Sequence, residues 1–405
     1  MPAPAERLHS GLGKFLLLAL SVALCITGFL ALDFVYSAVV RNRRKPAGAV
    51  DSCRVADPVR HHAFRPNCVA VDRWGKDSYS FFTNNLGMRD DRVRQVPPAN
   101  TKPRILLLGD SFTEGKNPWP DTYAGMIAAR LPQYDFLNGG VASYSPSNYL
   151  NTTRLALKAG VEPDEVIVFI DISDVSDEAA FYHDIGASGA VGGRAEEKWK
   201  HSWYTRLRMK VVKYLLLTNY LSEQAEQRLV ALGFYHLPKP EDDNLFDMER
   251  GAWTYRQVNE ADPWGAGYAP LGVEGGIVKE KAKMDLLWQE LHARNAPLSV
   301  VVYPWPQQVL HDTADSWQVR LWREWCAGRC KRFVSVFPEF LAAKVQCPTL
   351  QPGCWYARYF TFGDYHYNRA GNALVADKVM GSLQSDPPLK IGLQVPYSQA
   401  RISSQ

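Results

Sequence analysis

The sequence has little net charge, no internal repeat and no low-complexity tract. Its 405 residues contain 46 Lys and Arg against 42 Asp and Glu, which gives a formal net charge of +4 at pH 7. The small basic excess is spread along the chain and no nucleic-acid motif accompanies it, so DNA and RNA are not expected as partners. Hydrophobic residues make up 46% of the chain, and a chain of this length can bury a sizeable core.

The sequence also lacks the paired C-x-x-C spacing that is typical of structural zinc sites. Setting aside Cys25, which lies in an apolar N-terminal run, the remaining cysteines fall in three close pairs: Cys53 with Cys68, Cys326 with Cys330, and Cys347 with Cys354. Six cysteines allow fifteen connectivities, so these pairings are a hypothesis that rests on proximity. Disulfides indicate an oxidising compartment. Zinc binding and buried free thiols are the alternatives.

One long apolar run is present near the N-terminus. Residues Phe15–Leu32 are uncharged and largely apolar, and apolar character resumes through Val40 after Asp33. This length is sufficient to span a bilayer. Arg7 and Lys14 precede the run, as they would in a signal peptide, but the run is long and no convincing small-residue cleavage site follows. We therefore expect an uncleaved membrane anchor. The basic cluster that follows it, Arg41–Lys45, favours the cytoplasm for that end by the positive-inside rule, whereas the cysteines favour the outside.

An apolar strand followed by an abrupt polar turn is the most informative local pattern. Residues 104–108 read Arg-Ile-Leu-Leu-Leu, and Gly109, Asp110 and Ser111 follow directly. A serine at the carboxyl end of a strand, beside backbone N–H groups that turn toward a helix, can attack a carbonyl carbon while those donors hold the oxyanion. An ordinary polar turn is the alternative, because the tripeptide by itself is common.

The C-terminal part of the chain supplies a base for this serine. Asp364 and His366 precede a helical segment that runs to about Leu383. Histidine takes and returns a proton near neutral pH, and a carboxylate on its other ring nitrogen fixes the tautomer. Two residues apart on an extended segment, both side chains project to one face. We expect catalysis here in preference to loop capping.

Alternating β and α patterns predict an α/β fold in which a parallel sheet is covered by helices on both faces. The expected helices include Thr122–Leu131 and Val278–Ala293. The expected strands are Ile105–Leu108, Asp135–Leu137, Val166–Ile170, Leu298–Tyr303 and Phe333–Val336. In such sheets a site gathers at the carboxyl ends of the strands.

These motifs resemble those of the SGNH/GDSL hydrolase superfamily, and more narrowly a membrane-anchored bacterial branch related to alginate O-acetylation proteins. The resemblance runs from about Arg60 to Leu383 and implies a three-layer α/β/α SGNH-like fold. It assigns Ser111 as nucleophile, and the D-x-H spacing of Asp364 and His366 looks like the variant found in that branch. It also implies an extracytoplasmic catalytic domain, which decides our expectation of the orientation.

The resemblance assigns oxyanion donors as well. Besides the N–H of Ser111, it places Gly140 in the second block, within the run 138–145. In the third block Ser173 stands where the family has an asparagine. A serine hydroxyl is a shorter donor than a carboxamide, and losing one such donor costs about 3 kcal/mol in the transition state.

The sequence predicts the following division of the chain: a short tail over 1–14, an anchor over 15–40, a juxtamembrane and lead-in segment over 41–102, a catalytic domain over 103–385 and a tail over 386–405. Within the domain, residues 181–271 read as a helical insertion whose basic amphipathic stretch near Lys210–Leu217 either touches a membrane or packs on its own domain. Trp305, in Tyr-Pro-Trp-Pro, is expected either to line the substrate cleft or to stiffen a strand exit.

The expected activity is that of an O-acyl, mainly O-acetyl, ester hydrolase or an O-acetyltransferase. The expected substrate is an extracytoplasmic carbohydrate, and no metal or organic cofactor is required. Polysaccharide-modification proteins are candidate partners. The alternatives are a non-catalytic polysaccharide-binding or assembly protein on the same fold, and a lipid or thioester hydrolase. Sequence alone does not separate the hydrolase from the transferase, because both share the same first half-reaction.

Overall fold

The computed structural model describes residues 4–43, 52–74, 77–99, 102–186, 189–193, 215, 217–218, 221, 252–255, 268–346, 355–361 and 364–387. The chain divides into two compact units. One unit comprises Met1–Pro46 with Glu196–Pro238, and the other comprises Ala47–Ala195 with Lys239–Gln405. Most of the predicted helical insertion, the third cysteine pair and the C-terminal tail lie outside the described residues.

The second unit is built on a mixed sheet of eight strands in its described part. From one edge to the other, the strands are β12 (Arg332–Ser335), β11 (Leu298–Val302), β8 (Glu165–Ile170), β6 (Arg104–Leu108), β7 (Asp135–Asn138), β5 (Arg89–Asp90), β4 (Asp77–Thr83) and β3 (Val69–Trp74). The strands from β12 to β7 pair in parallel, whereas β5, β4 and β3 add to β7 as an antiparallel extension.

The strand order reverses between β6 and β8. The chain passes from β6 to β7 on one side of β6 and later returns to β8 on the other side. Where the connections after two adjacent strands run in opposite directions, a crevice forms at the carboxyl ends of those strands. Open α/β sheets bind their ligands in this crevice. The topology therefore places the end of β6, and Ser111 after it, at the favoured position for a site.

Successive side chains of each strand point to opposite faces of the sheet, so the hydrophobic core is divided into two layers. In β6, Ile105 and Leu107 belong to one hydrophobic cluster, whereas Leu106 and Leu108 belong to the other. All five residues of β6 are buried, as expected for a parallel strand covered on both faces. The result is a three-layer α/β/α arrangement, which agrees with the expected fold class.

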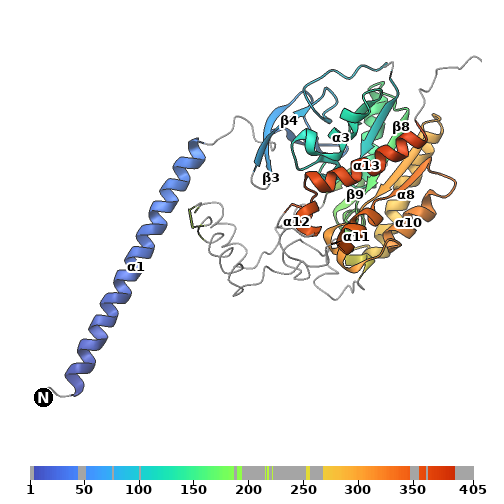
Figure 1. The fold of residues 1–405 in the computed structure, drawn as a ribbon. Coiled ribbons are helices and arrows are strands. Elements are labelled where there is room, and N and C mark those ends of the chain that lie inside the picture. Colours follow the sequence, from blue (N-terminus) through green and yellow to red (C-terminus); the bar gives the residue numbers. More distant parts are fainter. Residues whose placement is uncertain are drawn as a thin grey trace, which may run out of the picture. The chain divides into compact units, whose positions relative to one another are not determined.

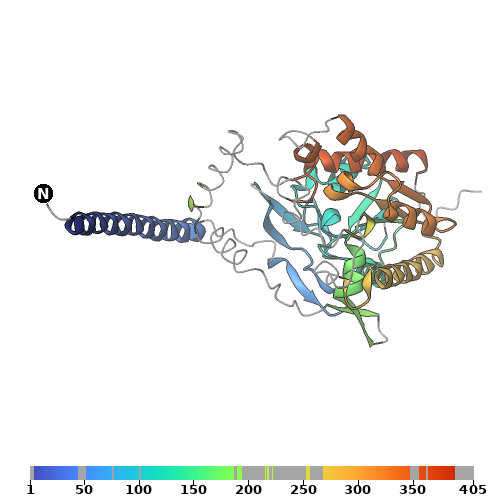
Figure 2. The ribbon, with the colours of Figure 1, turned by 90° about the horizontal axis from the view of Figure 1, so that it is seen from below.

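Helices far apart in sequence share each face. The first face carries α3 (Tyr123–Arg130), α9 (Pro306–His311), α11 (Phe337–Gln346), α12 (Trp355–Tyr359) and α13 (Arg369–Ser385). The opposite face carries α4 (Pro146–Lys158), α8 (Gly272–His292) and α10 (Trp317–Cys326). Helices α3 and α13 pack side by side on the first face (Figure 1). In Figure 2 the red helix α13 and the yellow-orange helix α8 lie on opposite sides of the sheet.

The remaining elements are short. Two hairpins pair β1 (Arg54–Asp57) with β2 (His61–Phe64) and β9 (Tyr182–Ile185) with β10 (Ala190–Gly193). Helical turns form α2 (Ser111–Glu114), α5 (Asp174–Ser176), a 3-10 turn at Trp119–Asp121 and a π-helical turn at Asp177–Phe181.

The five predicted strands agree with the observed strands to within one residue at each end. Three features differ from expectation. The stretch expected as a helical insertion over 181–271 starts with the β9–β10 hairpin. Helix α8 begins at Gly272 rather than Val278, and within this added stretch Gly276 packs where a Cβ would clash with the Val175 backbone. The lead-in segment also contributes β3, β4 and β5 to the main sheet, so the sheet is mixed rather than purely parallel.

The first unit contains α1 (Pro4–Arg43). Its Gly13–Val39 stretch has a mean hydropathy of 2.6, and this stretch is long and apolar enough to cross a membrane or to serve as a signal sequence.

Two of the three predicted disulfides are present. Cys53 bonds to Cys68, with the Cα atoms 5.8 Å apart, and Cys326 bonds to Cys330, with the Cα atoms 4.8 Å apart. The Cys347–Cys354 pair lies outside the described residues. Cys25 is a free, exposed cysteine.

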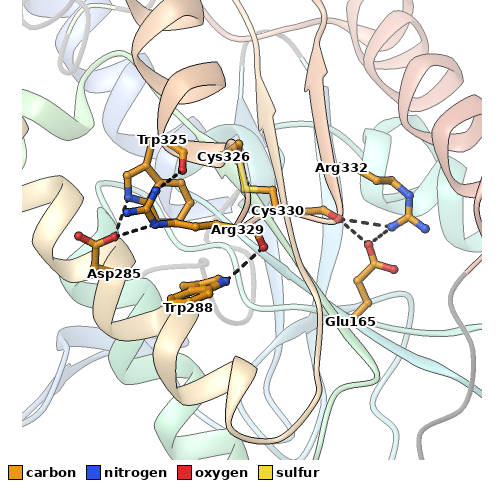
Figure 3. The surroundings of a disulfide bond; sticks show 9 residues. Glu165, Asp285, Trp288, Trp325, Cys326, Arg329, Cys330 and Arg332 are labelled. Atoms are coloured by element: carbon orange, nitrogen blue, oxygen red, sulfur yellow. Dashed lines mark hydrogen bonds and ion pairs between the residues drawn. A yellow bond between two sulfur atoms is a disulfide. The ribbon is translucent and has the colours of Figure 1, made fainter.

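The Cys326–Cys330 disulfide lies between the end of α10 and the edge strand β12 (Figure 3). Beside it, the Trp325 indole donates to Asp285 at 2.9 Å, and the Trp288 indole donates to the Arg329 carbonyl at 3.2 Å. Two helices and a short loop are thereby joined around the bond.

We expect the two disulfides to differ in their contribution to the free energy of unfolding. Their cysteines are 15 and 4 residues apart in sequence, and chain entropy gives about 3 kcal/mol for the longer loop and about 2 kcal/mol for the shorter one. Urea unfolding of Cys53→Ala/Cys68→Ala and of Cys326→Ala/Cys330→Ala, each against the oxidised wild type, measures both losses. An equal or larger loss for the shorter loop would show that loop closure is not the main contribution.

Candidate active site

Ser111 is the first residue of α2 and follows β6 after two residues. Asp110 caps the turn, because its Oδ1 accepts the N–H of Phe112 at 2.9 Å. Gly109 is required here, since a Cβ would overlap the Thr113 side chain. The local sequence thus forces a sharp change from strand to helix and leaves Ser111 at the carboxyl edge of the sheet. As the first residue of a helix, it has no intrahelical partner for its N–H.

Three predicted residues meet at this edge in a hydrogen-bonded line. His366 Nε2 lies 2.8 Å from Ser111 Oγ, and His366 Nδ1 lies 2.8 Å from Asp364 Oδ1. The backbone N–H of His366 also donates to Asp364 Oδ1 at 3.1 Å. With its proton on Nδ1, the imidazole donates to Asp364 and accepts from the Ser111 hydroxyl. Ser111 is 8% exposed and His366 is 3% exposed.

The loop that carries His366 is held from several sides. Tyr356 donates its hydroxyl to the Asp364 carbonyl at 2.9 Å, and the N–H of Thr361 donates to the His366 carbonyl at 2.8 Å. Tyr367 donates its hydroxyl to the Pro304 carbonyl at 2.7 Å, and its own carbonyl accepts from the Asn117 side chain at 2.8 Å. The imidazole position is therefore fixed by α12, by the end of β11 and by the loop after α2.

A second acceptor competes for the Ser111 hydroxyl. The hydroxyl also lies 3.2 Å from Asp110 Oδ2, and the other oxygen of Asp110 accepts from Tyr303 at 3.1 Å. Burial raises the pKa of Asp110 well above its usual range, and the nearby Asp171 carboxylate raises it further. His366 Nε2, at 2.8 Å against 3.2 Å for Asp110 Oδ2, is the closer acceptor for the hydroxyl proton.

Gly140 lies in the loop after β7, and its expected role as an oxyanion donor stays a prediction. Its N–H donates to the Asn138 side chain within the same turn, at 3.0 Å. Its Cα packs against Thr113 and Glu114 of α2, where a Cβ would clash. Glycine is therefore needed at this position for close packing, and in this structure its N–H is hydrogen-bonded to Asn138.

Ser173 lies at the carboxyl end of β8, beside β6, as the topology requires. It is 4% exposed, and its N–H donates to Asp171 Oδ1 at 2.7 Å. It precedes the short helix α5. This placement is compatible with an oxyanion role for its hydroxyl, but that role stays a prediction.

The loop after β7 is positioned by Glu114, a residue whose role was not predicted. Glu114 is fully buried, and its Oε2 accepts the N–H of Ala142 at 2.7 Å. The Lys116 ammonium donates to the same carboxylate at 2.6 Å, and the Arg54 guanidinium donates to both of its oxygens at 3.1 Å. Next along the loop, Ser143 has a positive φ of 62°. An acidic side chain three residues after the serine was the only sequence signal for this network.

The charges around Glu114 determine its ionisation. Burial acts to raise its pKa, but the Lys116 ammonium and the Arg54 guanidinium outweigh burial and lower the pKa to about 2. The carboxylate therefore stays ionised at any moderate pH and joins the lead-in segment to the nucleophile turn.

A buried arginine holds the other side of the same turn. The Arg89 guanidinium is 1% exposed and donates to the carbonyls of Glu114, Gly115 and Asn117. The lead-in segment therefore contacts the nucleophile turn through two cations, Arg54 and Arg89.

Trp305, expected either to line the substrate cleft or to stiffen a strand exit, is buried in the structure. It is 2% exposed, and its indole N–H donates to Asp171 Oδ2 at 2.7 Å. The half-buried Tyr365 ring stacks on it, with ring centroids 4.3 Å apart and ring planes 9° apart. A bound molecule would meet Tyr365 before Trp305, so Trp305 supports the surface of the site from below. Tyr365 was not predicted as a site residue, although it lies between Asp364 and His366 in the sequence.

Within the described residues, no group of three or more His, Cys, Asp or Glu side chains is arranged to hold a metal ion. The expectation that the site needs no metal or cofactor remains a prediction.

Comparison with known proteins finds no matching family model and no matching curated protein. Among solved structures, a catalytic mutant of an acetylxylan esterase from Geobacillus stearothermophilus has 12% identity and a TM-score of 0.36, over 71% of this chain and 96% of that chain. The psychrotrophic esterase EstA from a Pseudoalteromonas species has 9% identity and a TM-score of 0.34, over 70% and 98%. A GDSL-like lipase from Bacteroides thetaiotaomicron has 11% identity and a TM-score of 0.35, over 72% and 92%. Likenesses this weak carry no argument about the chemistry of this chain.

The Glu114 network predicts a specific loss of stability in acid. Because the folded pKa of about 2 lies below the ordinary glutamate pKa of 4.5, the carboxylate contributes stability above about pH 4.5, and that stability is lost as the pH falls toward 2. The difference corresponds to about 3 kcal/mol. We expect Glu114→Gln to be less stable than wild type by about this amount at pH 7 and to approach wild type near pH 2.

Urea unfolding at a series of pH values measures this difference. Glu339→Gln, which removes a surface ion pair with Lys378, is the matched control and should change little. A gap between Glu114→Gln and wild type that stays constant from pH 7 to pH 2 would contradict the assigned charge network.

Proposed function

We propose that the protein is a serine-dependent O-acyl ester hydrolase or O-acetyltransferase of the SGNH type that acts on an extracytoplasmic carbohydrate. The observation that carries this proposal is the hydrogen-bonded line of Ser111, His366 and Asp364, with both side-chain contacts of His366 at 2.8 Å. Nucleophile, base and orienting carboxylate are thereby in reach of one another, as acyl transfer requires.

In the first half-reaction, Ser111 Oγ attacks the ester carbonyl carbon while His366 Nε2 takes the hydroxyl proton. The carbonyl oxygen becomes an oxyanion, for which the N–H of Ser111 and the hydroxyl of Ser173 are the candidate donors. Collapse of the tetrahedral intermediate breaks the bond to the alcohol oxygen, and His366 returns its proton to that oxygen. Asp364 stabilises the imidazolium in between. The acyl group is left on Ser111.

In the second half-reaction, an acceptor hydroxyl attacks the acyl carbonyl carbon and gives its proton to His366. Collapse of this second tetrahedral intermediate breaks the bond to Ser111 Oγ, and His366 returns the proton to that oxygen. Water as acceptor yields a carboxylic acid and makes the enzyme a hydrolase. A sugar hydroxyl yields a new ester and makes it a transferase. Both outcomes use the same residues in the same roles, so the choice depends on which acceptor occupies the site.

The surroundings of Ser111 favour a small acyl group such as acetyl. The serine is 8% exposed. The Phe112 and Tyr365 rings have their centroids 4.8 Å and 4.5 Å from the centroid of the His366 imidazole. Space beside the nucleophile is therefore limited, which is harder to reconcile with a long acyl chain. The resemblance to O-acetylation proteins also supports acetyl.

The proposed location is a membrane with the catalytic domain on its outer side. The apolar stretch Gly13–Val39 would act as the anchor. Disulfides are rare where thiols are kept reduced, and the Cys53–Cys68 and Cys326–Cys330 bonds therefore support the extracytoplasmic side. Proteins of polysaccharide modification are the proposed partners.

The mechanism predicts that Ser111→Ala and His366→Gln each lower kcat for p-nitrophenyl acetate by about 10³-fold or more. Initial rates of nitrophenol release measure this effect. Ser385→Ala, at the exposed end of α13, is the control and should leave kcat unchanged. Wild-type turnover in Ser111→Ala would show that another nucleophile operates. A folded wild type that never turns over would favour a non-catalytic binding protein.

We expect Tyr365 to contribute to substrate binding through its exposed edge and face. Tyr365→Ala removes the ring that covers Trp305 and should raise KM for glucose pentaacetate about tenfold, because an aromatic contact is worth about 1 kcal/mol or slightly more. Tyr365→Phe keeps the stack and should stay near wild type. Measurement of acetate release gives both parameters, and an unchanged KM in Tyr365→Ala would remove this residue from the binding surface.

A further inference from the structure

Asp33 is a polar exception within the apolar helix α1. It is the only acidic residue in the Gly13–Val39 stretch. Its side chain is 1% exposed and that of Ser37, one turn later, is 0% exposed, whereas the neighbouring Leu32 is 72% exposed. Another segment of the same unit therefore packs against this short stretch of a helix that is otherwise exposed.

The cover is a segment nearly two hundred residues further along the chain. The N–H of Leu217 donates to Asp33 Oδ1 at 3.0 Å, and the N–H of Thr218 donates to Oδ2 at 2.7 Å. The Thr218 hydroxyl donates to Oδ2 at 2.6 Å, and the Ser37 hydroxyl donates to Oδ1 at 3.0 Å. Each carboxylate oxygen thus accepts two hydrogen bonds from the protein, which offsets the cost of removing this charge from water.

The position of Asp33 along α1 sets the depth of this contact in a bilayer. A hydrocarbon core about 30 Å thick takes about 20 helical residues. Counted from Phe15, where the uncharged run begins, that length ends at about Phe34. Asp33 therefore lies at the far boundary of the hydrocarbon core, and whatever is bonded to it lies at the same depth.

The covering segment has the composition of an interfacial element. Leu217 and Leu221, four residues apart, are 38% and 48% exposed, which leaves apolar side chains uncovered beside the contact with Asp33. The preceding residues of the sequence include Lys210 and Lys213 before the run Leu215–Leu217. Basic side chains suit lipid headgroups, and exposed leucines suit the boundary of the acyl chains.

We propose that the segment around Leu217–Thr218 is a second membrane-contacting element, fastened to the anchor by Asp33 and resting in the interface of the lipid bilayer. This proposal rests on the proposed anchoring role of α1. The segment belongs to the insertion within the catalytic domain, so the domain is attached to the membrane at two points of its sequence.

The test uses the full-length protein in vesicles of phosphatidylethanolamine and phosphatidylglycerol. A Leu221→Cys variant on a Cys25→Ser background carries an NBD label, and lipids bearing a nitroxide in the upper acyl chain act as quencher. The proposal predicts a loss of NBD emission with these lipids. A label on Val345→Cys, which is 78% exposed on α11 of the other unit, is the control and should keep its emission.

Two variants of Asp33 test whether the quenching at position 221 depends on the hydrogen bonds between Asp33 and the Leu217–Thr218 segment. Asp33→Ala removes all four acceptor interactions and should relieve the quenching at position 221, whereas Asp33→Asn keeps an acceptor oxygen and should retain part of it. Alkaline carbonate extraction of the same vesicles reports on the anchor separately. Emission at position 221 that is unaffected by nitroxide lipids, in wild-type protein that resists extraction, would overturn the proposal and leave the anchor intact. Protein that is extracted by carbonate would overturn both.

Discussion

A hydrogen bond of 2.8 Å between Ser111 and His366 joins two residues that are 255 positions apart in the sequence, and the rest of the catalytic unit holds its two ends in place. The sheet fixes one end, because β6 is buried on both faces and delivers Ser111 at the point where the strand order reverses. The C-terminal loop fixes the other end through hydrogen bonds from Tyr356 and Tyr367. A proton can pass between these residues only while both supports hold.

Buried charge is concentrated around the nucleophile turn, and its arrangement explains how the turn keeps its shape. Glu114 is ionised because Lys116 and Arg54 surround it, and it holds the loop after β7 through Ala142. Asp110, two residues beyond the end of the strand, has a raised pKa because burial isolates it near another carboxylate. The same turn therefore contains one carboxylate that is kept charged as a structural link and one carboxyl group whose pKa is raised. The difference arises because Glu114 has Lys116 and Arg54 as close cationic partners.

The extent to which the site could be predicted depends on the range of the interactions involved. Ser111, Asp364 and His366 could be found because each pattern is local and residue type alone indicates the chemistry. The strands were found to within a residue because buried parallel strands are continuous apolar runs. The hydrogen bond from the N–H of Gly140 to the Asn138 side chain could not be predicted, because no motif reports that contact. The burial of Trp305 could not be predicted, because it depends on stacking with Tyr365, which lies sixty residues further along the chain. Glu114 was missed because its partner Arg54 lies in a segment that sequence analysis treated as a lead-in.

The account depends on Ser111 becoming acylated through its contact with His366. The most direct measurement mixes the folded protein briefly with p-nitrophenyl acetate, quenches it in acid and maps acetyl groups by mass spectrometry of its peptides. The account predicts one acetyl group on the peptide that contains Ser111, absent from Ser111→Ala and strongly reduced in His366→Gln. An acetyl group on another residue, with Ser111 unmodified while ester is turned over, would contradict it.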